Sequence, residues 1–114
     1  MQDEILYKFL KLFESYPHLS QRDIAKQLDI SLGKVNKSIK YLTGKGFVTV
    51  KKLMRHPPRI PYQYSLTSRG LIELSKAAER YLNEVQENIK HLEDEMATIR
   101  QDLRTIQGRN TDNR

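Results

Sequence analysis

The chain has no cysteine, and no part of it is apolar enough to span a membrane. Without cysteine it can form neither disulfides nor thiolate metal sites, so a reducing compartment is permitted. No apolar run approaches the roughly 20 residues of a membrane span, and the N-terminal MQDEILYKF lacks the basic start and apolar stretch of a secretory signal. We therefore expect a soluble, cytoplasmic protein without a membrane partner.

Catalytic and metal-binding motifs are also lacking. The sequence has no glycine-rich phosphate loop, no nucleophile motif and no metal signature. Its histidines, His18, His56 and His91, have no spacing that would gather ligands. The carboxylates of HLEDEM are expected on solvated helix faces. We predict that the chain is not an enzyme and has no catalytic residue, no metal site and no cofactor.

Acidic residues are missing from the middle of the chain, between Asp29 and Glu73. Residues 1–67 carry 12 Lys and Arg against 5 Asp and Glu, a net charge of +7, whereas residues 68–114 carry 8 against 9, a net charge of −1. Unbalanced positive charge repels itself, so a partner with closely spaced negative charge is the simplest reason to keep it. Nucleic acid fits best, ahead of an acidic membrane or protein surface.

Two helices are predicted before this basic region. Apolar residues at helical spacing predict a first helix over residues 3–16, which Pro17 stops. Ser20 and, three residues later, Asp23 form a capping arrangement for a second helix. That helix is short and ends near Leu28.

A third helix is predicted to follow a tight connection, with Ser31 as its cap. Leu32, Val35, Ile39 and Leu42 step by three, four and three residues, which places all four on one inner side. The other side is basic, with hydrogen-bonding groups between the lysines. Lys37 lies opposite the apolar stripe with Gly33, Lys40 and Tyr41 around it, and the flanks hold Lys34, Asn36 and Ser38.

A β-hairpin is predicted next. Gly46 is expected to end the third helix in a left-handed conformation. Residues 47–53 and residues 62–66 are rich enough in β-branched and aromatic types to form two antiparallel strands. The basic stretch MRHPPRIP between them holds three prolines and therefore reads as a loop. Tyr62 and Tyr64 share one strand face, so we expect core positions rather than base stacking.

A long final helix is predicted from a Thr67 cap to about Ile106, with residues 108–114 disordered. Eight apolar residues in it are separated by steps of 3, 4, 3, 4, 3, 4 and 3, which is an unbroken heptad seam. A helix of about 40 residues is roughly 60 Å long, too long to fold back over so small a domain. We therefore expect a coiled-coil homodimer through Leu82, Val85, Ile89, Leu92, Met96, Ile99, Leu103 and Ile106.

The predicted fold class is mostly α with a small β-hairpin: a winged helix-turn-helix domain (residues 1–70), a long dimerisation helix (residues 71–107) and a disordered tail (residues 108–114). In winged helix-turn-helix domains the third helix enters the major groove and the hairpin wing reaches the adjacent backbone or minor groove. The expected partners are thus double-stranded DNA and a second copy of the chain.

The motifs also carry a family resemblance. The run LSQRDIAKQLDISLGKVNKSIKYLTGKGFVTV followed by YSLTSRGLIEL resembles MarR-type winged-helix regulators, most of all the small subgroup associated with exopolysaccharide gene clusters. The resemblance covers roughly residues 5–105 and implies a dimeric transcriptional regulator, often a repressor. Classical MarR proteins are longer and hold a pocket for phenolic ligands between extra helices, so no small-molecule ligand of that kind is expected here.

Sixteen residues are predicted to contact DNA from the second helix, the third helix and the wing. Asn36 can pair bidentately with adenine, and together with Ser31 and Lys34 it favours base reading over charge alone. The full set is Ser20, Gln21, Arg22, Ser31, Gly33, Lys34, Asn36, Lys37, Lys40, Tyr41, Lys45, Lys51, Lys52, Arg55, His56 and Arg59.

Two other functions use the same fold. A non-specific architectural DNA-binding or RNA-binding protein would use the basic face for phosphates only. A winged helix could also serve as a protein adaptor, but the charge concentrated on the third helix and the wing argues against that role. We therefore predict a dimeric, sequence-specific regulator, by resemblance a repressor, that binds an inverted repeat.

Overall fold

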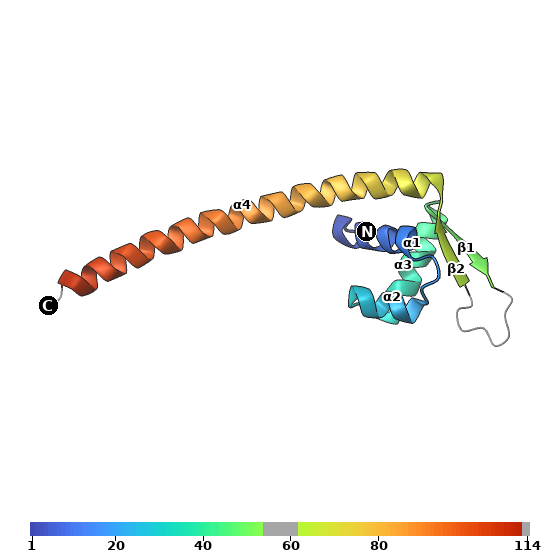
Figure 1. Ribbon diagram of the computed structural model, residues 1–114, viewed down its shortest axis with the longest axis horizontal. Helices are drawn as coiled ribbons and strands as arrows, with labels where there is room; N and C mark the ends of the chain where they lie inside the picture. The colour runs from blue at the N-terminus through green and yellow to red at the C-terminus, as the bar shows by residue number, and fades with distance from the viewer. Residues whose placement is uncertain (54–61, 113–114) are drawn as a thin grey trace. The chain divides into compact units, whose positions relative to one another are not determined.

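The computed structural model describes the backbone of residues 1–53 and 62–112 and the side chains of residues 1–53 and 62–109. Met1–Tyr81 forms one compact unit and Leu82–Arg114 forms another. The elements in chain order (Figure 1) are α1 Asp3–Ser15, α2 Gln21–Leu28, α3 Leu32–Gly44, β1 Val48–Lys52, β2 Tyr62–Leu66 and α4 Ser68–Asp112. The predicted class, a winged helix-turn-helix followed by a long helix, is confirmed.

The helix-turn-helix is built from local hydrogen bonds. Ser20 and Asp23 form a reciprocal capping box at the start of α2, with Oγ to backbone N and N to Oδ2 distances of 3.1 and 3.2 Å. Asp29 ends α2 in the left-handed region, at φ 54° and ψ 51°, which Asp tolerates better than most residues. Ser31 Oγ accepts the Lys34 backbone N–H at 3.1 Å and so caps α3. The predicted caps at Ser20 and Ser31 are confirmed.

One apolar cluster fills the first unit. α1 provides four of its buried side chains and α3 three, and the hairpin and the first turns of α4 close it. Leu32, predicted for the same stripe, is 45% exposed. It is the first residue of α3, and because helical side chains point toward the N-terminus it extends past the part of α3 that contacts the core. The cluster is Leu6, Phe9, Leu10, Phe13, Ile24, Val35, Ile39, Leu42, Val48, Tyr64, Leu74 and Ala77.

The wing is an antiparallel hairpin whose register runs from Val48 opposite Leu66 to Lys52 opposite Tyr62. Only one face of it contributes to the core, through Val48 and Tyr64, both 2% exposed. The Tyr64 backbone N–H donates to the Pro17 carbonyl at 3.1 Å. This bond fixes β2 against the connection between α1 and α2.

A compact joint links the end of α3, the wing and the start of α4. Gly46 adopts φ 78°, as predicted for a left-handed cap. The Thr67 hydroxyl donates to the Gly46 carbonyl at 2.6 Å and accepts the Gly70 N–H at 2.9 Å, while the Thr67 N–H donates to the Phe47 carbonyl at 3.0 Å. A methyl group on Gly70 would overlap that same Phe47 carbonyl. Thr67 therefore caps α4, as predicted, and also fixes where α4 begins relative to the wing.

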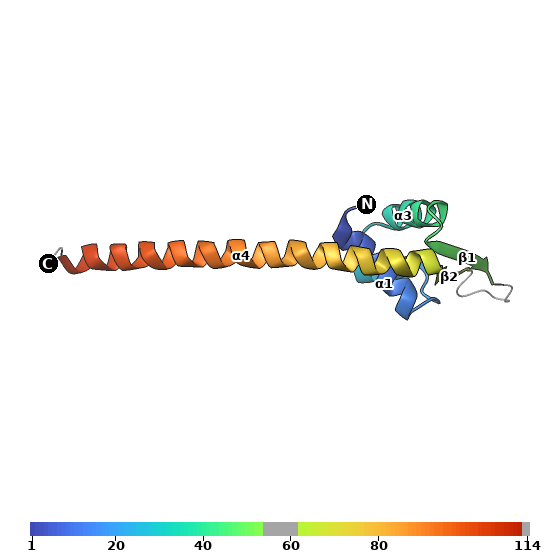
Figure 2. The ribbon, with the colours of Figure 1, turned by 90° about the horizontal axis from the view of Figure 1, so that it is seen from above.

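α1 lies beside the first turns of α4, as both views show (Figure 1 and Figure 2). The rings of Tyr7 and Tyr81 are 5.6 Å apart between centroids. Arg80 donates from Nε to Asp3 Oδ1 at 2.8 Å and from Nη2 to Glu73 Oε1 at 3.0 Å. The first unit thus includes α4 as far as Tyr81, beyond the predicted domain boundary at residue 70. The predicted three-part division is not tested further and stays a prediction.

The far end of α4 differs from the prediction. The helix continues to Asp112, past the expected end near Ile106 and into the segment for which disorder is predicted. Gly108 is the only strong helix breaker there, and it costs about 1 kcal/mol relative to alanine. That cost is too small to stop a helix that is already nucleated.

Candidate nucleic-acid interface

The inner and outer sides of α3 divide as the periodicity predicted except at Leu32, which is exposed, and Ser38, which is buried. Val35, Ile39 and Leu42 are buried, as is Ser38, which the periodicity places on a flank and which is 8% exposed. Ser38 lies beside the buried stripe because it comes three residues after Val35 and four before Leu42. We call the remaining exposed residues the outer face of α3: Gly33, Lys34, Asn36, Lys37, Lys40 and Tyr41.

The N-terminal end of α3 lets another molecule approach its backbone. A side chain placed on Gly33 would meet nothing within 4 Å, so the peptide groups there border open space. The Ser31 hydroxyl already accepts the Lys34 N–H, so one of its two lone pairs is used, while its proton and its second lone pair are left for a partner. Helix N-termini carry partial positive charge and unpaired N–H groups, which suits them to anions.

The start of α2 contributes the second part of the predicted site. Ser20 is committed to the capping box, and its hydrogen bonds lower the pKa of Asp23 below the ordinary value. Arg22 is exposed. Gln21 is half-buried and makes two side-chain hydrogen bonds, from Nε2 to the Tyr64 hydroxyl at 3.1 Å and from Asn36 Nδ2 to its Oε1 at 3.4 Å. The structure therefore joins Gln21 directly to the outer face of α3.

Tyr64 is the residue of this site that the sequence reasoning missed. It is a core residue, as expected, and its ring lies 5.4 Å from that of Phe13. Its hydroxyl, however, accepts the bond from Gln21. A buried tyrosine normally needs a polar partner, and that rule was the available signal. Tyr62, expected in the core as well, is 39% exposed because it lies at the outer end of β2, opposite Lys52.

The described part of the wing adds positive charge. Lys51 and Lys52 are both exposed on β1. Lys45, after α3, lies with Nζ 5.7 Å from the centre of the Tyr41 ring, a cation–π distance. The predicted contacts Arg55, His56 and Arg59 lie outside the described residues.

The lysines of this surface are not neutralised within the described part of the chain. There, the ion pairs lie within α1, within α4 or between these two helices, and none involves a lysine of α3 or β1. With no acidic residue between Asp29 and Glu73, their positive charges are left for solvent or a partner. Among the predicted DNA contacts that the structure describes, the lysines of α3 and β1 are thus exposed and have no acidic partner. The Ser20 and Ser31 side chains instead cap α2 and α3.

The predicted dimer seam lies in the second unit. Seven of its eight residues are between 46% and 60% exposed, and Val85 is half-buried. A helix that keeps such a row of apolar side chains in water forgoes the free energy of their burial. Homodimerisation through the seam is not tested by these facts and stays a prediction.

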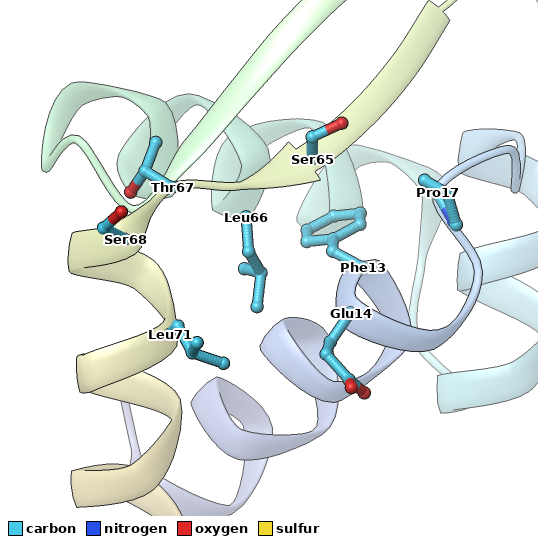
Figure 3. Close-up of a pocket in the computed structure, with 8 residues that line it drawn as sticks. All are labelled: Phe13, Glu14, Pro17, Ser65, Leu66, Thr67, Ser68 and Leu71. Carbon is cyan, nitrogen blue, oxygen red and sulfur yellow. The ribbon is translucent and has the colours of Figure 1, made fainter.

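An open pocket lies between the end of α1, the end of β2 and the start of α4 (Figure 3). Phe13, Leu66 and Leu71 give it an apolar wall, and Glu14 lies at its edge. Glu14 bonds Lys11 at 2.9 Å, which lowers the pKa of its carboxyl. We assign this pocket no ligand, and the expectation of no small-molecule ligand stays a prediction.

Two other kinds of site are not found in the part of the chain that the structure describes. Among the described side chains, those of residues 1–53 and 62–109, no three His, Asp or Glu are grouped so that they could hold a metal ion. No helix in those same ranges is both long and apolar enough to cross a membrane.

Comparisons with known proteins agree with this architecture. Residues 2–49 match the model of a family described as winged helix-turn-helix DNA-binding. A search of curated protein sequences gave no match. The fold and the exposed helix together define a winged helix-turn-helix protein.

Several solved structures share this fold. The adhesin competence repressor AdcR of Streptococcus pyogenes is 26% identical, with a TM-score of 0.59 over 82% of this chain and 64% of that one. A mutant of MepR from a multidrug-resistant clinical isolate of S. aureus is 17% identical, with a TM-score of 0.56 over 93% and 78%. FabT of Streptococcus pneumoniae, solved in complex with DNA, is 19% identical, with a TM-score of 0.53 over 96% and 76%.

These neighbours confirm the predicted MarR-type winged-helix fold. The chain spans 64% of the length of AdcR, so it corresponds to about two thirds of that repressor. The particular resemblance to the exopolysaccharide-associated subgroup is not tested by these neighbours and stays a prediction.

Proposed function

We propose that this chain is a DNA-binding transcription regulator that acts as a homodimer and recognises a specific inverted repeat. One observation carries the proposal: the outer face of α3 is exposed, basic and free of acidic residues, on the helix that follows the turn of a helix-turn-helix. In this class of domain that helix enters the major groove, where base edges can be read.

The exposed side chains divide into two roles. Lys34, Lys37, Lys51 and Lys52 supply charge for phosphates, which gives affinity without sequence information. Asn36 carries a carboxamide, whose donor and acceptor match those of adenine in the major groove. The open backbone at Gly33 would allow the N-terminus of α3 to approach the DNA closely.

The exposed heptad seam supports the dimer. Burying seven large apolar side chains per chain against a second copy would contribute about 1.5 to 3 kcal/mol for each fully buried side chain. A two-fold dimer presents two copies of α3, so its site would be an inverted repeat with half-sites about one helical turn, or a multiple of it, apart.

Structural neighbours support the same conclusion. FabT was solved in complex with DNA, and AdcR is named as a repressor. Repression is therefore our proposal for the direction of regulation. The alternative, a non-specific architectural protein for DNA or RNA, uses the same lysines but has no need for a carboxamide on the outer face.

Selection of bound fragments from a random DNA library separates the two functions. Enrichment of one inverted repeat is the result we expect. Tight binding without any enriched sequence would favour the non-specific alternative, and no binding at low salt would contradict both. RNA duplexes of matched length serve as the competitor in the same binding assay.

A further inference from the structure

A chain of two hydrogen bonds connects the wing to the outer face of α3. Tyr64 on β2 is 2% exposed, and its hydroxyl accepts the Gln21 Nε2–H at 3.1 Å. Gln21 Oε1 in turn accepts the Asn36 Nδ2–H at 3.4 Å. The first bond is half-buried and the second is exposed, so the chain leads from the core to the surface that would meet DNA.

We propose that Tyr64 and Gln21 are positioning residues that orient the Asn36 carboxamide for base reading. This inference rests on the proposed function. Asn36 Nδ2 has two hydrogens, and one is used by Gln21. The second N–H and Oδ1 are left, and adenine offers N7 as an acceptor and N6–H as a donor in the major groove. With one N–H bonded to Gln21, the carboxamide can therefore still donate to adenine N7 and accept from adenine N6–H.

The direction of the two bonds, that is, which residue donates and which accepts, determines which groups Asn36 has left for a base. In the observed polarity Tyr64 accepts, Gln21 donates to it, and Asn36 keeps its oxygen. In the reverse polarity Asn36 would accept the Gln21 N–H with one lone pair of Oδ1 and keep both of its own N–H groups, which would suit the two acceptors of guanine. A buried hydroxyl in the wing strand thus helps to hold, through Gln21, the side chain proposed to read a base.

Replacing Tyr64 with phenylalanine tests the proposal on DNA. The ring and its packing stay and only the acceptor is lost. We expect affinity for the selected site to fall about three- to tenfold, as for loss of one hydrogen bond, while affinity for random duplex stays within about twofold. In a Gln21→Ala background the same change should have no further effect. Tyr62→Phe, on the same strand without a bond to Gln21, is the matched control.

The selected sequences give a second result. Adenine should be enriched at the base pair whose contribution disappears in Asn36→Ala. Guanine at that position would overturn the polarity. Equal losses on selected and random DNA for Tyr64→Phe would overturn the positioning role, because a purely structural change weakens both.

A measurement without DNA separates failure of this proposal from failure of the proposed function. The side-chain amide signals of Asn36 in a ¹⁵N spectrum should shift in Tyr64→Phe, because Gln21 bonds both residues, and should stay in place in Tyr62→Phe. Unchanged Asn36 signals would overturn the proposal whatever the DNA result. A shift in a protein that enriches no sequence would instead contradict the proposed function.

A second inference concerns the seam and rests on different residues. We infer that two copies of the second unit pair in parallel. With Leu82 at heptad position a, Glu95 falls at g and Arg100 at e. In a parallel pair these flank the seam and face each other across chains, once on each side. The other facing g and e residues bring no like charges together.

The antiparallel arrangement is opposed by charge. If all eight seam positions overlap, with Leu82 opposite Ile106, then Glu93 faces Glu93 and Glu95 faces Glu95 at the centre of the pair. Like charges directly opposed across such a seam repel. Sliding the pair by one heptad removes these contacts but uncovers two seam residues of each chain.

The absence of native cysteine gives a clean test by disulfide formation. Under mild oxidation, Val85→Cys alone and Leu103→Cys alone should each form a covalent dimer if the chains are parallel. An antiparallel pair would place residue 85 near residue 103, so only the double variant would cross-link, and that result would overturn the orientation. Mass by light scattering, measured on the unmodified protein, reports separately on the proposed dimer.

A charge exchange checks the same orientation. Glu95→Arg and Arg100→Glu should each weaken dimerisation several-fold, and the combined variant should recover most of the loss. No recovery in the combined variant would contradict the g to e contact. Lys90→Glu, at a position away from the seam, is the control for a change of net charge.

Discussion

Two amphipathic helices in this chain each have one face without a partner, a charged face in α3 and an apolar face in the second unit. α3 has its apolar side buried and carries unbalanced positive charge on its outer face. The second unit, from Leu82 onward, mixes charges of both signs but leaves its apolar seam exposed. What each helix lacks indicates its partner: an anion for α3, and an apolar surface for the end of α4.

The comparison also separates two kinds of evidence. Charge without a counterion indicates a ligand that is polyanionic, and its contribution falls with salt. An exposed apolar row indicates a protein surface, and its contribution depends little on salt. The two regions can therefore be tested independently.

Salt should produce the largest effect. If about four lysines or arginines per chain contact phosphates, a dimer neutralises on the order of 8 phosphates and the log–log salt slope is roughly −7. Affinity would then fall about 10⁴-fold between 50 and 200 mM salt. Fluorescence anisotropy across that range measures the slope. A value flatter than about −2 would show that the basic surface is not the interface.

Breaking the seam should produce the next largest effect. Leu92→Asp combined with Ile99→Asp removes about 1.5 to 3 kcal/mol of burial per side chain and places charges in the interface. We expect monomers at micromolar concentration, a folded first unit, and loss of most of the affinity for the inverted repeat. Light scattering and circular dichroism measure mass and folding.

The matched control for this change is His91→Asp combined with Thr98→Asp. Each of these residues precedes a seam position by one, so the substitutions add charge without entering the seam. The control should remain dimeric. If the unmodified protein is itself monomeric at micromolar concentration, both the dimer and the inverted repeat are wrong.

A smaller effect should separate base reading from charge. Asn36→Ala should cost about 1 to 3 kcal/mol on the selected site with little loss on random DNA. Lys51→Ala should weaken both to a similar extent, because a phosphate contact carries no sequence information. Titration of each variant against the selected duplex and against the random duplex gives the ratio of the two affinities. Equal losses for both variants would favour the non-specific function.

The smallest effect is expected at the cap of α3. Ser31→Ala removes the acceptor for the Lys34 N–H, so it should lower the free energy of unfolding by about 1 kcal/mol. Urea denaturation measures the loss, and Ser31→Thr, which keeps the hydroxyl, should retain most of the stability. A stability unchanged in Ser31→Ala would show that the cap contributes little. If the free energy of unfolding does fall, part of any loss of DNA affinity in Ser31→Ala is due to the destabilised start of α3.

Features determined by neighbouring residues were predictable from the sequence. Ser20, Ser31 and Thr67 cap helices because a hydroxyl can reach an N–H two or three residues ahead, and Gly46 accepts a positive φ that other residues resist. These depend on a few consecutive residues. The order of helices and strands followed from the same local signals and from periodicity.

Features determined by distant residues were not predictable. Gln21 and Tyr64 are 43 residues apart, and only the folded wing brings them together. Leu32 and Ser38 were assigned to sides of α3 from angle alone, whereas their exposure depends on where α3 meets the core. The sixteen predicted DNA contacts are still untested, because they depend on how the protein docks on DNA.

The joint at Gly70 has a consequence for which parts of this sequence could change independently of one another. The LTSRG motif, which helped to carry the resemblance, contains Thr67 and Gly70, and both serve the crossing of α4 over the Phe47 carbonyl. Neither belongs to the surface proposed to read DNA. The residues on the outer face of α3 could therefore be replaced without altering this joint. We expect that the motif reports on how α4 is joined to the wing and carries no information about the base sequence that α3 would read.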